Sequence, residues 1–98
     1  MNKRQAKKKR NKSIYRDTWS LDYAIAKFVL PRLICFKKVN NGHPMHLTSQ
    51  EWDEILDKMI IAFDLIANTG IWDTTPEQEK QIDEGMDLFR KYYFDLWW

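Results

Sequence analysis

Four carboxylates at helical spacing are the residues of this sequence best placed to do chemistry with a metal ion. Glu54 precedes Asp57 by three residues, and Glu84 precedes Asp87 by the same interval. A separation of three residues puts both carboxylates of a pair on one face of a helix. Two such pairs facing each other could hold Mg²⁺, which prefers oxygen ligands and substrate phosphates. One hypothesis is therefore a Mg²⁺-dependent nucleotide hydrolase.

The two pairs resemble the E-x-x-E … E-x-x-D signature of all-alpha nucleotide pyrophosphohydrolases, except that Asp57 stands where that family has a glutamate. Such pairs also arise by chance. With 14 acidic residues among 98, about two are expected, and Glu51 with Glu54 forms a third. We therefore expect a protein that is not an enzyme and needs no cofactor, with the Mg²⁺ hydrolase as the alternative.

Aromatic and basic residues in the first half of the chain could bind a ligand instead. Rings stack on planar groups such as nucleobases, and guanidinium or ammonium groups bind phosphates and carboxylates. The candidate ligand-binding residues are Trp19, Tyr23, Lys27, Arg32, Lys37 and His43. Arg32 falls on a predicted buried stripe, where a charge needs a partner. That partner is either an acidic residue of the same domain, such as Asp22 or Asp57, or the anionic group of a ligand.

The charge of the chain is divided between its two parts. Seven of the 16 basic residues lie within the first twelve positions, where no acidic residue occurs. The remainder holds nine basic and 14 acidic residues, a net charge of −5. We predict a disordered basic arm over residues 1–13 and a helical domain over residues 14–98. The arm could bind nucleic acid non-specifically through its cations, which is a further alternative function. Its basic residues are Lys3, Arg4, Lys7, Lys8, Lys9, Arg10 and Lys12.

The spacing of apolar residues predicts a first helix from near Ser20 to Val39, capped by Thr18 or Ser20. Pro31 lacks a backbone N–H and clashes with the preceding turn, so it should kink or split this helix. The predicted buried stripe consists of Leu21, Ile25, Phe28, Val29, Arg32 and Phe36.

Two further helices have clear start signals. Thr48 with Glu51, and Thr75 with Gln78, each have the spacing of a capping box. Gly70 suits a left-handed cap after the second helix, and Gly85 would allow another helix to approach the third closely. The sequence therefore predicts an all-α protein, a three-helix bundle with a Pro-kinked first helix.

Fourteen aromatic residues are more than a core of this size can bury. We therefore expect a homo-oligomer that associates through aromatic faces. No apolar run is long enough for a membrane span or a secretory signal, and the single Cys35 fits a reducing compartment. These features favour the cytoplasm and no membrane partner.

Several motifs resemble a family of small bacteriophage and prophage proteins of uncharacterised activity. The similarity covers about residues 15–98, and its main motifs are Asp17-x-Trp19-x-Leu21-Asp22-Tyr23, Leu30-Pro31-Arg32-Leu33, Gly42-x-Pro44 and Glu51-Trp52-x-Glu54-Ile55-Leu56-Asp57-Lys58-Met59. The resemblance implies a phage accessory protein in the cytoplasm of a bacterial host. Such a protein would bind a host factor, with counter-defence as the expected task. It would either sequester a nucleotide immune signal or block a host defence protein.

Overall fold

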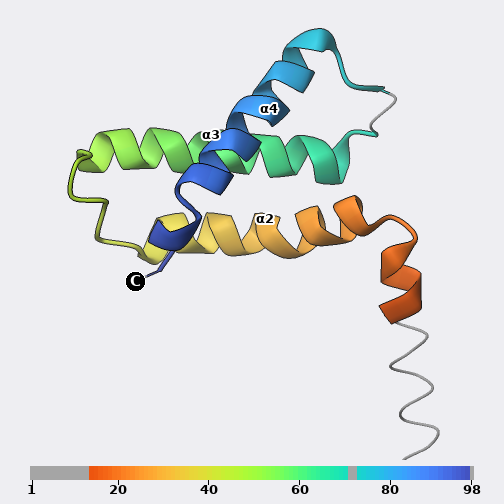
Figure 1. Cartoon of the computed structure of the whole chain (residues 1–98), viewed down its shortest axis with the longest axis horizontal. Helices are drawn as coiled ribbons and strands as arrows, with labels where there is room; N and C mark the ends of the chain where they lie inside the picture. The colour runs from red at the N-terminus through yellow and green to blue at the C-terminus, as the bar shows by residue number, and fades with distance from the viewer. Residues whose placement is uncertain (1–13, 71–72, 98) are drawn as a thin grey trace, which may run out of the picture.

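The chain folds into helices throughout the part that the computed structural model describes, residues 14–70 and 73–97. Residues 14–18 form an N-terminal helical segment. It is followed by three longer helices, α2 (Leu21–Val39), α3 (Ser49–Asn68) and α4 (Pro76–Lys91) (Figure 1). A 3-10 turn, η2 (Tyr93–Asp95), lies near the end of the chain. No strand occurs in these residues, so the predicted all-α class is confirmed. The predicted basic arm over residues 1–13 lies outside the described part.

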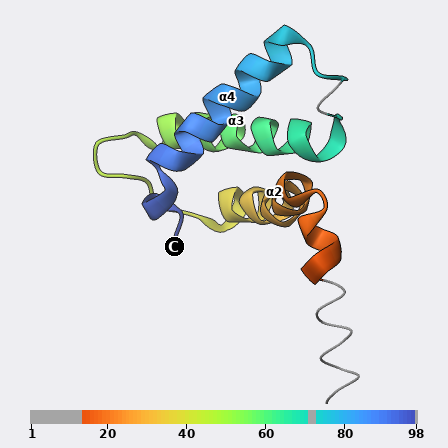
Figure 2. The same ribbon diagram turned by 45° about the vertical axis from the view of Figure 1, so that its right-hand side comes forward.

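α3 is the central helix of the fold. α2 runs alongside it in the opposite direction, and α4 crosses it obliquely, as two views show (Figures 1 and 2). The extensive helix–helix contacts of the described chain are those of α3 with α2 and with α4. The buried core consists of Ala26, Leu33, Trp52, Leu56, Met59, Ala62, Phe63, Ala67 and Tyr92. Six of these nine residues belong to α3, because it is covered on two sides.

Both predicted capping boxes are confirmed. Thr48 accepts a hydrogen bond from the Glu51 backbone N–H at 3.1 Å, and the Glu51 carboxylate accepts one from the Thr48 N–H at 2.9 Å. Thr75 and Gln78 form the same pair of bonds at the start of α4, with Pro76 as the first helical residue. These bonds satisfy backbone donors that a helix start would otherwise leave unpaired.

Two predictions about helix ends are wrong. α3 ends at Asn68 with Thr69 in an extended conformation (φ −121°, ψ 125°), and no described glycine has a positive φ. The chain leaves α3 in an extended path, so Gly70 makes no left-handed cap. At the start of α2, Ser20 occupies the N-cap position but makes no side-chain capping bond, and the Thr18 hydroxyl donates to the Tyr15 carbonyl instead.

The predicted buried stripe of α2 is wrong for four of its six residues. Leu21, Ile25, Phe28 and Arg32 are exposed, while Val29 and Phe36 do pack against the core. The residues of α2 that face α3 are Ala26, Val29, Leu30, Leu33 and Phe36. Apolar residues occupy more than one side of this helix, so their spacing alone could not identify the inner side. The helix also continues unbroken through Pro31, which rules out the predicted split and leaves the kink a prediction.

Gly85 lies where α4 crosses α3. A Cβ atom added there would lie 2.5 Å from the Lys58 carbonyl oxygen and closer still to the Ala62 Cβ. Real Cβ atoms do not approach a backbone atom this closely, so the glycine sets the distance between the two helices. The predicted close approach at Gly85 is confirmed.

We expect Gly85→Ala to lower the free energy of unfolding by about 1–3 kcal/mol, the usual cost of overpacking a well-packed contact. The loss should occur although alanine favours a helix by about 1 kcal/mol over glycine. Urea denaturation followed by circular dichroism measures it. Gly42→Ala is the control, because an added Cβ there meets only the Asn40 side chain at 3.7 Å. Equal stability of the two variants would show that the helices can move apart without cost.

We expect Thr48→Ala to destabilise the fold by about 1 kcal/mol, since it removes the N-cap of α3.

The capping bonds with Thr48 lower the pKa of Glu51. A carboxylate with a lowered pKa stabilises the folded state above its ordinary pKa, and the effect is lost as pH falls through the lowered value. Wild type should therefore exceed Glu51→Gln in stability at neutral pH and lose this advantage in acid. An advantage that persists in acid would contradict this origin.

Candidate functional site

A groove of about 930 Å³ opens where the N-terminal helical segment meets α2. Trp19 is 88% exposed there, and the ring of Tyr15 is also largely exposed. The groove is lined by Tyr15, Arg16, Asp17, Trp19, Ser20, Tyr23, Ala24 and Lys27. The N-terminal segment points away from α3 (Figure 1). Residues of this segment and residues of α2 both line the groove. This is an aromatic site with charged groups at its edge.

Three of the six predicted ligand-binding residues meet in this groove: Trp19, Tyr23 and Lys27. The Lys27 ammonium lies 5.0 Å from the centroid of the Tyr23 ring, which is the geometry of a cation–π contact. Tyr15 and Arg16 also line the groove, although they were not among the predicted ligand-binding residues. A signal for Tyr15 was present, because Tyr15, Trp19, Tyr23 and Lys27 follow one another at intervals of four residues. On a helix this spacing places side chains on one face.

Arg32 lies outside the groove and is exposed, which corrects its predicted burial. Its guanidinium carbon lies 3.6 Å from the centroid of the Phe28 ring, and Nη1 donates to the Phe28 carbonyl at 2.8 Å. Asp57, one of the two carboxylates considered as a partner, binds Lys37 instead. The Arg32 side chain therefore covers part of an exposed ring on the outer side of α2.

Lys37 joins α2 to α3. Its ammonium donates to the Asp57 carboxylate at 2.5 Å. The pKa of Lys37 is raised, mainly by this hydrogen bond, and the charges of Asp57 and Asp53 add to the effect. Lys37 is thus engaged within the fold and does not line the aromatic groove.

His43 lies near the other end of α2, after a helix about 28 Å long. It borders a second, smaller pocket of about 500 Å³ together with Trp52, Asp95 and Trp97. Its Nδ1 is 3.0 Å from the Pro44 carbonyl oxygen. The indole N–H of Trp52 is buried there, and no described residue accepts a hydrogen bond from it. Trp52 instead packs against the Tyr92 ring, with centroids 5.6 Å apart and planes at 70°. The sequence did not indicate this pocket.

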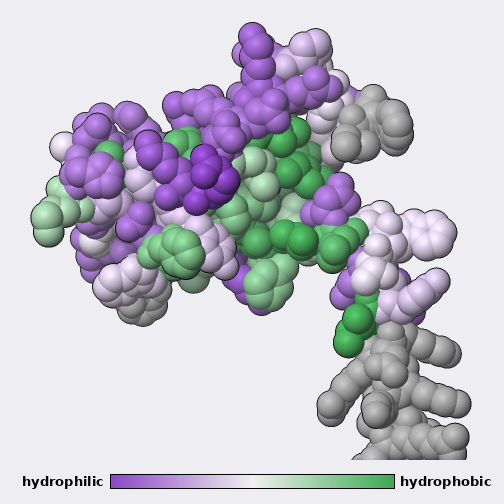
Figure 3. All heavy atoms as spheres, viewed as in Figure 1, coloured by the Kyte–Doolittle hydropathy of each residue, from purple (hydrophilic) through white to green (hydrophobic). Residues whose placement is uncertain are grey.

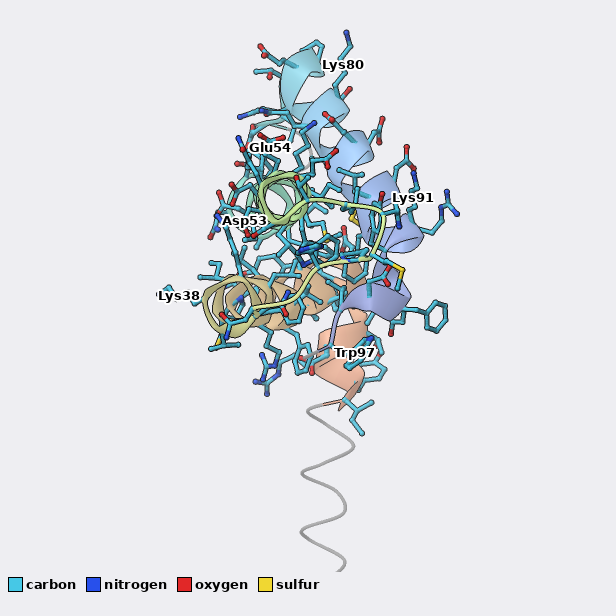
Figure 4. The ribbon with its side chains drawn as sticks, turned by 90° about the vertical axis from the view of Figure 1, so that its left-hand side faces the viewer. Lys38, Asp53, Glu54, Lys80, Lys91 and Trp97 are labelled. Carbon is cyan, nitrogen blue, oxygen red and sulfur yellow. The ribbon has the colours of Figure 1, made fainter. Side chains whose placement is uncertain are left out.

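The four predicted metal ligands are distributed along α3 and α4. Asp57 binds Lys37, and Glu84 accepts a hydrogen bond from Lys58 at 2.7 Å, which raises the pKa of Lys58. Asp53 and Glu54 project from α3 on the side away from Lys91 of α4 (Figure 4). Within residues 14–70 and 73–97, no group of three or more histidine, cysteine, aspartate or glutamate side chains is arranged to hold a metal ion.

Comparison with protein-family models, curated proteins and solved structures finds no match. No helix in the described part of the chain is long and apolar enough to cross a membrane.

We expect the Lys37–Asp57 pair to contribute modestly to stability, because both side chains are partly exposed. A double-mutant cycle with Lys37→Met and Asp57→Asn should give a coupling energy of about 0.2–1 kcal/mol by urea denaturation. Because the pKa of Lys37 is raised in the folded state, the ion pair stabilises the fold fully at a pH below the pKa of the unfolded chain. This contribution disappears as the pH rises through the raised pKa. A Lys37→Met variant of unchanged stability that loses ligand binding would instead assign Lys37 to the ligand.

Proposed function

We propose that this chain is a non-catalytic accessory protein of a bacteriophage that acts in the host cytoplasm by binding a host factor. The observation that carries the proposal is the aromatic groove, in which Trp19, Tyr23 and Lys27 meet. The phage context rests on the motif resemblance, and counter-defence is the task that this context favours. We further propose that the chain acts as an oligomer.

The groove suits a ligand that combines a planar ring with negative charge. The rings of Tyr15, Trp19 and Tyr23 offer stacking surfaces. Covering an exposed aromatic ring with a ligand lowers the free energy of the complex. Arg16 and Lys27 provide two cations at the groove, against the single carboxylate of Asp17. Stacked rings and nearby cations are the features that bind a nucleobase and its phosphate. A nucleotide immune signal is therefore the favoured host factor, and a host defence protein is the alternative.

The composition of the groove supports binding over hydrolysis. Mg²⁺ in nucleotide hydrolases is held by carboxylates together with the substrate phosphates. The groove lining offers one carboxylate and no histidine. A ligand bound there would accordingly be retained unchanged, which is what sequestration requires.

Calorimetric titration with a panel of linear and cyclic nucleotides tests the proposal. We expect one class to bind, and we expect Trp19→Ala and Lys27→Ala each to weaken binding by roughly tenfold or more. Stacking on Trp19 is worth about 1–3 kcal/mol per base, and a hydrogen bond from the Lys27 ammonium to a phosphate about 1.5–3 kcal/mol. Chromatography of the mixture should recover the nucleotide intact. Phe94→Ala is the matched control, because Phe94 is as exposed as Trp19 but lies in η2 and outside the groove.

Three outcomes decide between the alternatives. If no nucleotide binds but Trp19→Ala loses the capture of a host protein, the host-protein form is correct. Turnover of a nucleotide in the presence of Mg²⁺ would overturn the non-catalytic assignment. If the groove variants bind every nucleotide and host partner as well as wild type does, the groove is not the binding site and the proposal is wrong.

A further inference from the structure

Six residues of α2 lie on a continuous line with the spacing of a coiled-coil seam. They are separated by intervals of four, three, four, three and four residues, in the order Leu21, Ile25, Phe28, Arg32, Cys35 and Val39. Intervals that alternate between three and four define the a and d positions of a heptad, the two positions that face a second helix. With a rise of 1.5 Å per residue, this seam extends along the whole of α2, about 28 Å.

The seam has no partner within the described part of its own chain. All six residues are exposed, and Leu21, Ile25 and Phe28 are between 49% and 58% exposed. None of them lines the aromatic groove, and the α2 residues that pack on α3 are a separate set. Hydrophobic side chains accordingly reach the molecular surface along α2 (Figure 3). α2 therefore has a face against α3, a face toward the groove and an uncovered apolar face.

We propose that this face packs against the same face of a second copy of the chain. A heptad pattern fits a helix of matching spacing, and the same surface on two copies can pair about a two-fold axis. The positions beside the seam that hold Ala24 and Pro31 carry short side chains, which allow a second helix to approach closely. The groove and the seam share no residue and come together at Ala24, which lines the groove and lies beside the seam.

The position of Arg32 favours an antiparallel pair. In a parallel pair, Arg32 would lie opposite the Arg32 of the second copy, and like charges at short distance repel. In an antiparallel pair with Ile25 opposite Phe28, Arg32 of one copy lies opposite Leu21 and beside Asp22 of the other. The cation then meets a carboxylate twice in the dimer, once at each end. This charge complementarity identifies a second copy of the chain as the occupant.

The area of the contact suits a weak dimer. In this antiparallel register the two helices overlap over residues 21–32, because Cys35 and Val39 lie opposite residues that precede α2. Specific interfaces bury about 1,200–2,000 Å² in total, and a contact over about 12 residues of each helix falls below this range. We therefore expect a dissociation constant on the order of 100 micromolar. The exchange of free and bound chains should be observable over ordinary protein concentrations.

Sedimentation velocity of the full chain at increasing concentration tests the proposal. We expect wild type to form dimers and the double variant Ile25→Glu, Phe28→Glu to remain monomeric. Both side chains are half exposed in the single chain, so circular dichroism should show that the helices are retained. Met45→Glu and Phe94→Glu, which change exposed apolar residues away from α2, should leave the dimer intact. A wild type that is still monomeric at about millimolar concentration, or a dimer that persists in the double variant, would overturn the proposal.

A charge exchange tests the orientation. Arg32→Asp should weaken the dimer by about tenfold or more, because it brings a carboxylate beside Asp22 of the second copy. Adding Asp22→Arg should restore association. The two residues are ten positions apart on one helix and cannot contact each other within a chain, so rescue requires the antiparallel contact. A dimer whose affinity does not change in either variant, or that is not restored in the exchanged pair, would exclude this arrangement.

Discussion

The whole structure depends on α3 being packed on two sides by helices that scarcely meet each other. Its four largest fully buried side chains are Trp52, Leu56, Met59 and Phe63. α2 covers α3 along its length. α4 crosses α3 at Gly85, where the absence of a side chain lets the backbone of Lys58 come close. Without the α3 side chains neither neighbour would have an apolar surface to cover. One helix thus supplies most of the core of a small protein.

This arrangement has a consequence for α2. A helix of a closed bundle is covered by two neighbours, whereas α2 packs extensively only on α3. Its remaining surface includes the aromatic groove at the N-terminal end and the apolar seam that includes Phe28. The candidate ligand site and the proposed dimer contact are thus both on the helix with the least internal support. The fold leaves them available because they are not needed to hold it together.

The sequence predicted those parts of the fold that depend on local chemistry. The capping boxes at Thr48 and Thr75 depend on hydrogen bonds between residues three positions apart, and both are present. The close approach at Gly85 depends on steric contact at one helix crossing, and it is present too. The inner face of α2 could not be predicted in the same way, because Phe28 and Val29 are both apolar and only the position of α3 decides which is buried. For the same reason Arg32 was predicted to be buried although it is exposed.

The crossing at Gly85 also divides α4 into two unequal parts. Beyond the crossing, Leu88, Phe89 and Tyr92 pack into the core, and the Phe63 and Phe89 rings meet edge to face at 4.9 Å. Before it, no residue of α4 is fully buried, and the first turn is held by the bonds between Thr75 and Gln78. Local opening free energies follow buried contacts, so the start of α4 can unwind while its end stays in place. The C-terminal part of α4 is therefore held by the core, whereas the N-terminal part is held mainly by its own capping bonds.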